Sequence, residues 1–355
     1  MQRAALPSRV TELLGIELPI VSGPMGGVAG PELVGAVSEA GGLGLLGHAN
    51  VAPDQVRAEI RQTKALTARP FGIGLLFPSR RDTPAPAPAP LPDFLQRFVG
   101  PDGLADVPAS SYSHEMAEER LEIAIAEGVK VLSLGLGAPG HIVDRAKSAG
   151  MKVIALTGSL RAALEVEALG VDAIVAQGHE AGGHTGRVST MVLVPQVADA
   201  VKVPLLAAGG IMDGRGLAAA LMLGADGVLI GTRLIATPEA RTHQNHKNGI
   251  VEMREDNTLV SRCYTGKPSR VIRNAFTDAW KGHDAEILDM PAQWERVAPV
   301  VIPAKRSGSL DVANWPTGQG AVLVGTIMPA QEVIRTMAEE ALDVLAKPQR
   351  DIKTS

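Results

Sequence analysis

The residues best suited to chemistry lie in one glycine-rich stretch, residues 174–186, with the sequence IVAQGHEAGGHTG. Its first residues are typical of the end of a buried strand, and the rest form a loop that carries Gln177 and His184. Glycine lets a backbone approach a flat ligand closely and adopt positive φ, and an imidazole can exchange protons near neutral pH. The stretch therefore predicts a flavin lying against the loop, with His184 as a general base for a bound substrate.

Two later loops, Ala208-Gly209-Gly210-Ile211 and Gly231-Thr232-Arg233, each follow a short apolar run. Glycine amides can point at phosphate oxygens, and a following helix N-terminus adds favourable partial charge. One Gly-Gly pair alone would indicate only a tight turn. Two such loops after consecutive strands predict a phosphate site.

The opposite border of this site is expected at Pro24, Met25 and Gly26, and at Gly74 inside an apolar run. The Gln177 amide offers both a donor and an acceptor, which suits the edge of an isoalloxazine ring. Two alternatives stay open: Gln177 could form a hydrogen bond within the loop, and His184 could merely anchor it.

These residues need a scaffold that brings strand ends together. Apolar runs alternate with amphipathic segments at residues 19–22, 43–46, 71–76, 129–134, 153–156, 173–176, 203–208 and 227–230. Glycines after the intervening helices are expected C′ residues. Eight such units predict a (β/α)8 TIM barrel, in which ligands bind at the carboxyl ends of the strands. A doubly wound sheet ranks second, because GPMGG after the first run does not match G-x-G-x-x-G.

The chain is predicted to divide into a barrel (1–237), a smaller, mainly helical added domain (238–316) and a segment returning to the barrel (317–355). Within the helical segments, residues 192–201 are expected to form a helix broken at its start by Pro195. The alternating Pro-Ala tract, residues 83–90, is interpreted as an extended surface excursion.

Composition restricts the partners. The net charge is −4 and no basic run stands out, which argues against nucleic acid. No window has about 18 uninterrupted apolar residues, and the N-terminus lacks the apolar core of a signal peptide. We expect a cytoplasmic enzyme with a small-molecule substrate, and the formation of a homo-oligomer stays open. Cys263, the single cysteine, is expected to be a buried structural thiol. No metal site is expected, because the histidines do not match H-E-x-x-H.

Together, the stretch QGHEAGGHTG from Gln177, the loops AGGI and GTR, the opening Gly23-Pro24-Met25 and the later TGKPSR from Thr265 resemble the nitronate monooxygenase family, formerly the 2-nitropropane dioxygenases. The resemblance implies noncovalent FMN and oxidation of alkyl nitronates by O2 to a carbonyl compound and nitrite. It implies His184 as catalytic base and a flavin lined by Gln177 and Gly182, with the phosphate held by Gly210, Gly231, Thr232 and Arg233. The neighbouring Gly183 and Gly209 are also expected to bind the cofactor.

One departure concerns Gly74, where the family commonly has asparagine; the Pro-Ala tract is also unusual. Two rival functions stay open. One is an NAD(P)H-dependent flavin reductase of the same superfamily, either an enoyl-acyl carrier protein reductase or a quinone reductase. The other is a flavin-binding module without turnover.

Overall fold

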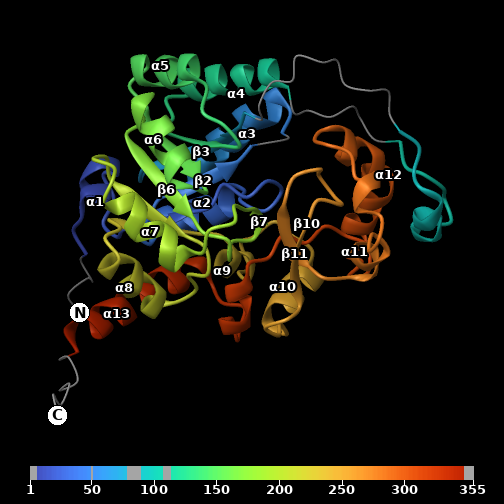
Figure 1. The fold of residues 1–355 in the computed structure, drawn as a ribbon. Helices are drawn as coiled ribbons and strands as arrows, with labels where there is room; N and C mark the ends of the chain where they lie inside the picture. The colour runs from blue at the N-terminus through green and yellow to red at the C-terminus, as the bar shows by residue number, and fades with distance from the viewer. Residues whose placement is uncertain (1–5, 49–50, 78–88, 107–112, 348–355) are drawn as a thin grey trace, which may run out of the picture.

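The computed structural model describes residues 6–48, 51–77, 89–106 and 113–347, and its centre is a barrel of eight parallel strands (Figure 1). All eight predicted strands are confirmed. Their order around the sheet is β1-β9-β8-β6-β5-β4-β3-β2. The strands are β1 (Ile20–Ser22), β2 (Gly44–Gly47), β3 (Phe71–Leu76), β4 (Val131–Gly135), β5 (Lys152–Thr157), β6 (Ala173–Gln177), β8 (Leu205–Ala208) and β9 (Gly227–Ile230).

A bridge between Val21 and Leu43 joins β1 to β2 and nearly completes the barrel. Alternate residues along each strand point inward, as in other small barrels. These inward side chains form an interior core with Val10 and Leu14 of α1 (Arg9–Leu14). Because Arg9 also binds Asp226, just before β9, α1 covers the amino-terminal end of the barrel. The opposite end is left for ligands.

An outer ring of helices covers the barrel. It consists of α2 (Pro31–Glu39), α3 (Pro53–Leu66), α4 (His114–Ala126), α5 (Gly140–Ser148), α6 (Leu160–Ala168), α7 (Thr190–Ala198), α8 (Gly214–Met222) and the C-terminal α13 (Ala330–Ala346). Glycines follow several of these helices with positive φ, including Gly128 at 72° and Gly170 at 80°, so the predicted C′ role is confirmed. Helix α13 packs beside α8, where the Gly214 N–H donates to Glu340 at 2.9 Å.

The predicted break at Pro195 was wrong, because Pro195 lies inside α7. The helix begins earlier, at Thr190. The Glu180 carboxylate accepts hydrogen bonds from the Thr190 N–H at 2.9 Å and from its hydroxyl at 2.9 Å. An acid at a helix N-terminus satisfies free N–H groups and the helix dipole.

The chain after the barrel forms a second lobe, on the right in Figure 1. Its elements are α10 (Gln244–Val251), β10 (Thr258–Ser261), β11 (Ser269–Ile272), α11 (Ala275–Ala279), η2 (Asp284–Glu286) and α12 (Ala292–Arg306). The prediction of helices here did not include the two strands. Strand β11 pairs with β10 on one side and with β7 (Gly183–His184), from the loop after β6, on the other.

The excursion between β3 and α4 contributes to this lobe. Leu91 and Leu95, in and beside η1 (Asp93–Phe98), pack with Phe276 and Trp280 in its hydrophobic core. Residues 83–88 of the Pro-Ala tract lie outside the described residues, but the Pro90 carbonyl accepts from Arg296 Nε at 2.8 Å.

The lobe also buries Cys263. Its thiol is fully buried, as predicted, and burial raises its pKa to about 12.

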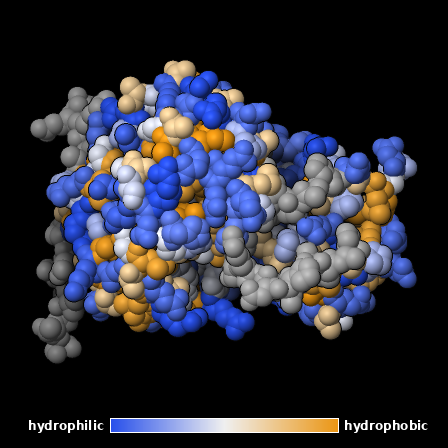
Figure 2. All heavy atoms as spheres, turned by 90° about the horizontal axis from the view of Figure 1, so that it is seen from above, coloured by the Kyte–Doolittle hydropathy of each residue, from blue (hydrophilic) through white to orange (hydrophobic). Residues whose placement is uncertain are grey.

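Among the described residues on the face shown in Figure 2, hydrophilic ones predominate and hydrophobic ones form small groups. Within the described ranges, none of the helices is long and apolar enough to cross a membrane.

Candidate active site

All the candidate residues from the sequence lie at the carboxyl end of the barrel, in or after β1, β3, β6, β8 and β9. The connection after β9 is α9 (Thr232–Ile235), which begins immediately beyond Gly231. This end of a TIM barrel is where ligands bind. The topology therefore gathers residues that are separated by more than 200 positions in the chain.

The floor of this end is unusually free of bulky side chains. Gly47, Gly74 and Ser133 stand at one level across β2, β3 and β4. Ser133 points inward because Val131, two residues earlier on β4, belongs to the barrel's interior core. Its buried hydroxyl has no hydrogen-bond partner among the described residues. A buried orphan hydroxyl is uncommon, and here it stands beside a glycine floor.

Contacts join the loops on this side into one rim. A side chain at Gly74 would overlap the Pro24 ring, and a Cβ at Gly231 would lie 3.5 Å from Met25 Sδ. The Thr232 hydroxyl accepts a hydrogen bond from the Gly318 N–H at 2.9 Å. Gly318 in turn lies against Gly182, where a Cβ would be 2.7 Å from the Gly318 nitrogen. The rim thus runs from β3 through β1 and β9 to the loop after β6, by way of the chain before η3 (Gln319–Leu323).

The loop after β6 is held by its own hydrogen bonds. Gln177 Nε2 donates to the His184 carbonyl at 2.5 Å, and the Thr185 hydroxyl donates to the Gly178 carbonyl at 3.1 Å. His179 Nδ1 lies 2.9 Å from the Gly186 carbonyl. The alternative that Gln177 stabilises the loop is therefore correct for one of its amide hydrogens, which bonds the His184 carbonyl. That leaves the amide oxygen for a ligand.

His184 stands on β7, where it is opposite Ser269 of β11. Its Nε2 lies 3.1 Å from the Thr265 hydroxyl. Burial lowers the pKa of His184 to about 4, and the positive charge of Lys267 adds to this effect. The imidazole is therefore neutral at neutral pH, which is the form that can accept a proton.

The two predicted phosphate loops lie side by side because β8 and β9 are neighbours in the barrel. Gly209 and Gly210 have φ values of 103° and 75°, a backbone conformation that glycine adopts most easily. Arg233 is buried, and burial lowers the pKa of its guanidinium. Within the described residues, no carboxylate lies within ion-pair distance of Arg233. A buried cation without an acid partner is costly unless an anion joins it.

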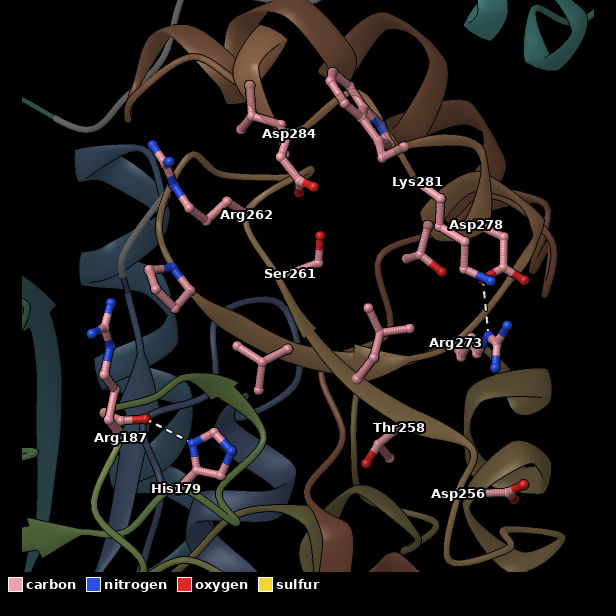
Figure 3. A pocket seen from close by; sticks show the side chains of 17 residues that line it. His179, Arg187, Asp256, Thr258, Ser261, Arg262, Arg273, Asp278, Lys281 and Asp284 are labelled. Atoms are coloured by element: carbon pink, nitrogen blue, oxygen red, sulfur yellow. Dashed lines mark hydrogen bonds and ion pairs between the residues drawn. The ribbon is translucent and has the colours of Figure 1, made fainter.

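Two cavities flank the loop after β6. One, of about 390 Å³, is lined by Gly209, Gly210, Glu180 and Thr190 among others. The other, of about 660 Å³, lies against β10 and α11 and is shown in Figure 3. Arg187 and His179 border it from the barrel side, and Arg262 and Lys281 from the added lobe. His184 lines neither cavity.

Sequence reasoning gave no role to three residues of this site: Thr265, Lys267 and Ser133. Thr265 and Lys267 occur in the stretch that resembles the family, but no local pattern places them beside His184. Ser133 had a signal, since it is the one hydroxyl within the apolar stretch VLSLG of β4.

Comparisons with known proteins give the family to which the chain is related. The family model described as nitronate monooxygenase matches residues 7–340. The chain belongs to the nitronate monooxygenase family. It is 32% identical to a probable nitronate monooxygenase of Staphylococcus saprophyticus, over 96% of this chain and 99% of that protein. A probable nitronate monooxygenase of Staphylococcus aureus is 31% identical over 95% and 98% of the two chains.

Solved structures of the nitronate monooxygenase superfamily share the same fold. A nitroalkane oxidase from Streptomyces ansochromogenes matches with a TM-score of 0.81 and 30% identity, covering 95% of this chain and 99% of the other. FabK from Thermotoga maritima matches with a TM-score of 0.79 and 34% identity, covering 96% and 98%. The chain is therefore an oxidoreductase of a flavin-dependent family with a TIM-barrel fold.

Proposed function

We propose that this protein is an FMN-dependent enzyme that oxidises alkyl nitronates, and the nitroalkanes from which they form, with O2 to a carbonyl compound and nitrite. The observation that carries the proposal is the state of His184. Its imidazole is neutral at neutral pH and is held on β7 at the ligand-binding end of the barrel. A nitroalkane carries an acidic α C–H, and a neutral imidazole is a suitable base for that proton.

The residues present fit FMN. Gly47 and Gly74 let Pro24 and Met25 pack closely against this floor, and the orphan Ser133 hydroxyl offers a hydrogen-bond donor to a ring bound there. Arg233 and the glycine amides after β8 and β9 would hold the phosphate, and Pro24, Met25, Gly26, Gly182 and Gly183 would border the ring with Gln177. When bound, FMN supplies the electron acceptor that no side chain provides.

The chain's own residues perform the remaining tasks. The loop hydrogen bond from Gln177 to the His184 carbonyl fixes the backbone that carries the base. Holding base and substrate in one geometry lowers the entropic part of the barrier. His184 then takes the α-proton of a neutral nitroalkane, whereas a nitronate, which has already lost that proton, does not need this step.

Nitrite release tests the proposal. The purified protein is incubated with a nitroalkane or its nitronate in air, without nicotinamide, and nitrite and carbonyl product are measured. We expect both products and an absorption spectrum of oxidised flavin. A colourless protein that takes up no FMN, or a yellow one that releases no nitrite, would contradict the proposal.

The second candidate is an NAD(P)H-dependent flavin reductase. It is favoured by the 34% identity to FabK, which is slightly above the identity to the nitroalkane oxidase. Rapid anaerobic bleaching of the flavin by NADH or NADPH, with no nitrite formed in air, would establish this function instead. A flavin-binding module without turnover would show neither reaction, and loss of His184 would change nothing measurable.

A further inference from the structure

The imidazole of His184 is fixed by a segment of the added lobe and not only by its own loop. Its Nε2 lies 3.1 Å from the Thr265 hydroxyl, which is 81 residues later in the chain. The same hydroxyl donates to the Lys267 carbonyl at 3.2 Å and accepts from the Lys267 N–H at 3.3 Å. Thr265 therefore stands at the centre of three polar contacts.

The Thr265 hydroxyl can donate only one hydrogen bond, and this limit decides which nitrogen of His184 carries the proton. A hydroxyl has one hydrogen and two acceptor lone pairs. When Thr265 gives its hydrogen to the Lys267 carbonyl, its oxygen can only accept, from the Lys267 N–H and from His184 Nε2–H. The hydroxyl, the Lys267 N–H, the Lys267 carbonyl and His184 Nε2 then all have partners. Reversing the His184 bond would leave the Lys267 carbonyl without this donor and would place the imidazole hydrogen on Nδ1.

We propose that Thr265 is a positioning residue that holds His184 in the tautomer protonated on Nε2, so that Nδ1 is the nitrogen that accepts the substrate proton. The catalytic role of Nδ1 rests on the proposed function, whereas the tautomer of His184 does not depend on it. The lone pair on Nδ1 is free only in this tautomer. A neutral imidazole protonated on Nδ1 and hydrogen-bonded through Nε2 would have no lone pair left for the substrate.

The turn that carries Thr265 is built to stay in place. Gly266 has a φ of 80°, and its N–H donates to the Arg262 carbonyl at 2.8 Å. Arg262 Nε donates back to the Gly266 carbonyl at 2.9 Å. A side chain at Gly266 would overlap backbone atoms of Met290. Immediately after the turn, β11 pairs with β7, so Thr265 and His184 are anchored to the same small sheet.

The direct test is the tautomer of His184 in the flavin-loaded protein. Histidine-labelled protein is examined by 15N NMR at pH 7, with His184→Asn used to assign the signals. We expect a pyrrole-type Nε2 and a pyridine-type Nδ1. In Thr265→Val, the hydroxyl contact is lost and the Nδ1-protonated form should become populated, whereas Thr265→Ser should retain the parent tautomer. A parent protein protonated on Nδ1, or a tautomer unchanged in Thr265→Val, would overturn the inference.

Kinetics give a second readout. Thr265→Val should lower kcat for a neutral nitroalkane about tenfold or more, a part of the roughly 10²–10⁴-fold contribution of a general base, and change nitronate oxidation less than about twofold. Thr265→Ser should recover most of the loss. Equal losses with both substrates would contradict a positioning role.

A matched control uses another Thr–His pair. Thr242→Val removes a 3.0 Å contact with His246 Nδ1, a contact that does not include His184, and should leave the His184 tautomer unchanged. A change there would show that NMR is reporting a general disturbance. Flavin content and thermal unfolding of each variant show whether it folds. If the parent releases no nitrite, the proposed function fails while the tautomer result still decides the inference.

Discussion

The ring of Pro24 occupies the space in which a side chain at Gly74 would stand. Pro24 follows β1 and Gly74 lies in β3, so this contact joins two strand ends at the edge of the candidate site. An asparagine at position 74 would have no room unless Pro24 moved. The glycine at position 74 is therefore required by the position of the Pro24 ring.

Gly74→Ala tests this packing. The added methyl group would overlap Pro24, and overpacking of this kind typically costs about 1–3 kcal/mol. We expect the free energy of unfolding, measured in urea, to fall by that amount. Gly325→Ala is the control, because its Cβ would have no heavy atom within 4 Å. A Gly74→Ala protein as stable as the Gly325→Ala protein would contradict the contact.

The pH dependence of nitroalkane oxidation should reflect the lowered pKa of His184, about 4. Because the base must be neutral, kcat/KM should fall only as the pH drops through about 4, and not near 6.5 as for an ordinary histidine. Lys267→Met removes a positive charge that lowers this pKa, so the acid limb should move to higher pH. The profile is measured with a nitroalkane that stays protonated over the range. An acid limb near 6.5 in the parent would refute the assignment.

Arg233 should discriminate FMN from riboflavin. Its buried guanidinium has a lowered pKa because of burial, and a phosphate would offset the cost of that burial. A charged hydrogen bond of about 1.5–3 kcal/mol predicts that Arg233→Met weakens FMN binding about tenfold or more and leaves riboflavin binding nearly unchanged. Fluorescence titration of the apoprotein measures both ligands. Arg215→Met, at an exposed arginine paired with Asp213, is the control. Equal weakening of both flavins would argue against a phosphate contact.

His246 should make the fold sensitive to acid. Burial lowers its pKa to about 3, with a further contribution from Lys305, and both ring nitrogens contact threonine hydroxyls, those of Thr242 and Thr317. The folded pKa lies below the unfolded value, so the unfolded state binds the proton first. The stabilisation is complete above about pH 6.5 and is lost as the pH falls toward 3, at up to about 1.4 kcal/mol per pH unit.

Urea unfolding at several pH values checks the His246 prediction. His246→Gln should show a shallower decline of stability with falling pH than the parent. His141→Gln, which removes an exposed histidine on α5, controls for the loss of an imidazole. Identical slopes for the parent and His246→Gln would contradict the prediction.

Much of the fold could be predicted because each strand and helix is determined mainly by residues next to one another in the sequence. Each barrel strand is a short apolar run closed by turn residues, and βα topology alone brings the ends of β6, β8 and β9 together. Hence Gln177, Gly210 and Gly231 could be placed at one end of the barrel without coordinates. The start of α7 was harder, since it depends on Glu180, a residue outside the helix.

The remaining features depend on contacts between distant segments. Strand β7 has only two residues and exists because β11, more than 80 residues later, pairs with it. Leu91 and Leu95 show no periodic pattern that would assign them to the core of the added lobe. The contact of Thr265 with His184 follows from that strand pairing, so the sequence could name both residues without showing that they meet.

The most direct measurement compares His184→Asn with the parent on two substrates, a neutral nitroalkane and the corresponding nitronate, at equal flavin content. We predict that oxidation of the neutral nitroalkane falls at least about 100-fold, the lower end of the range for loss of a general base, while oxidation of the nitronate and nitrite release from it stay within about threefold. Equal rates of the variant and the parent on the neutral nitroalkane would contradict the central role of His184.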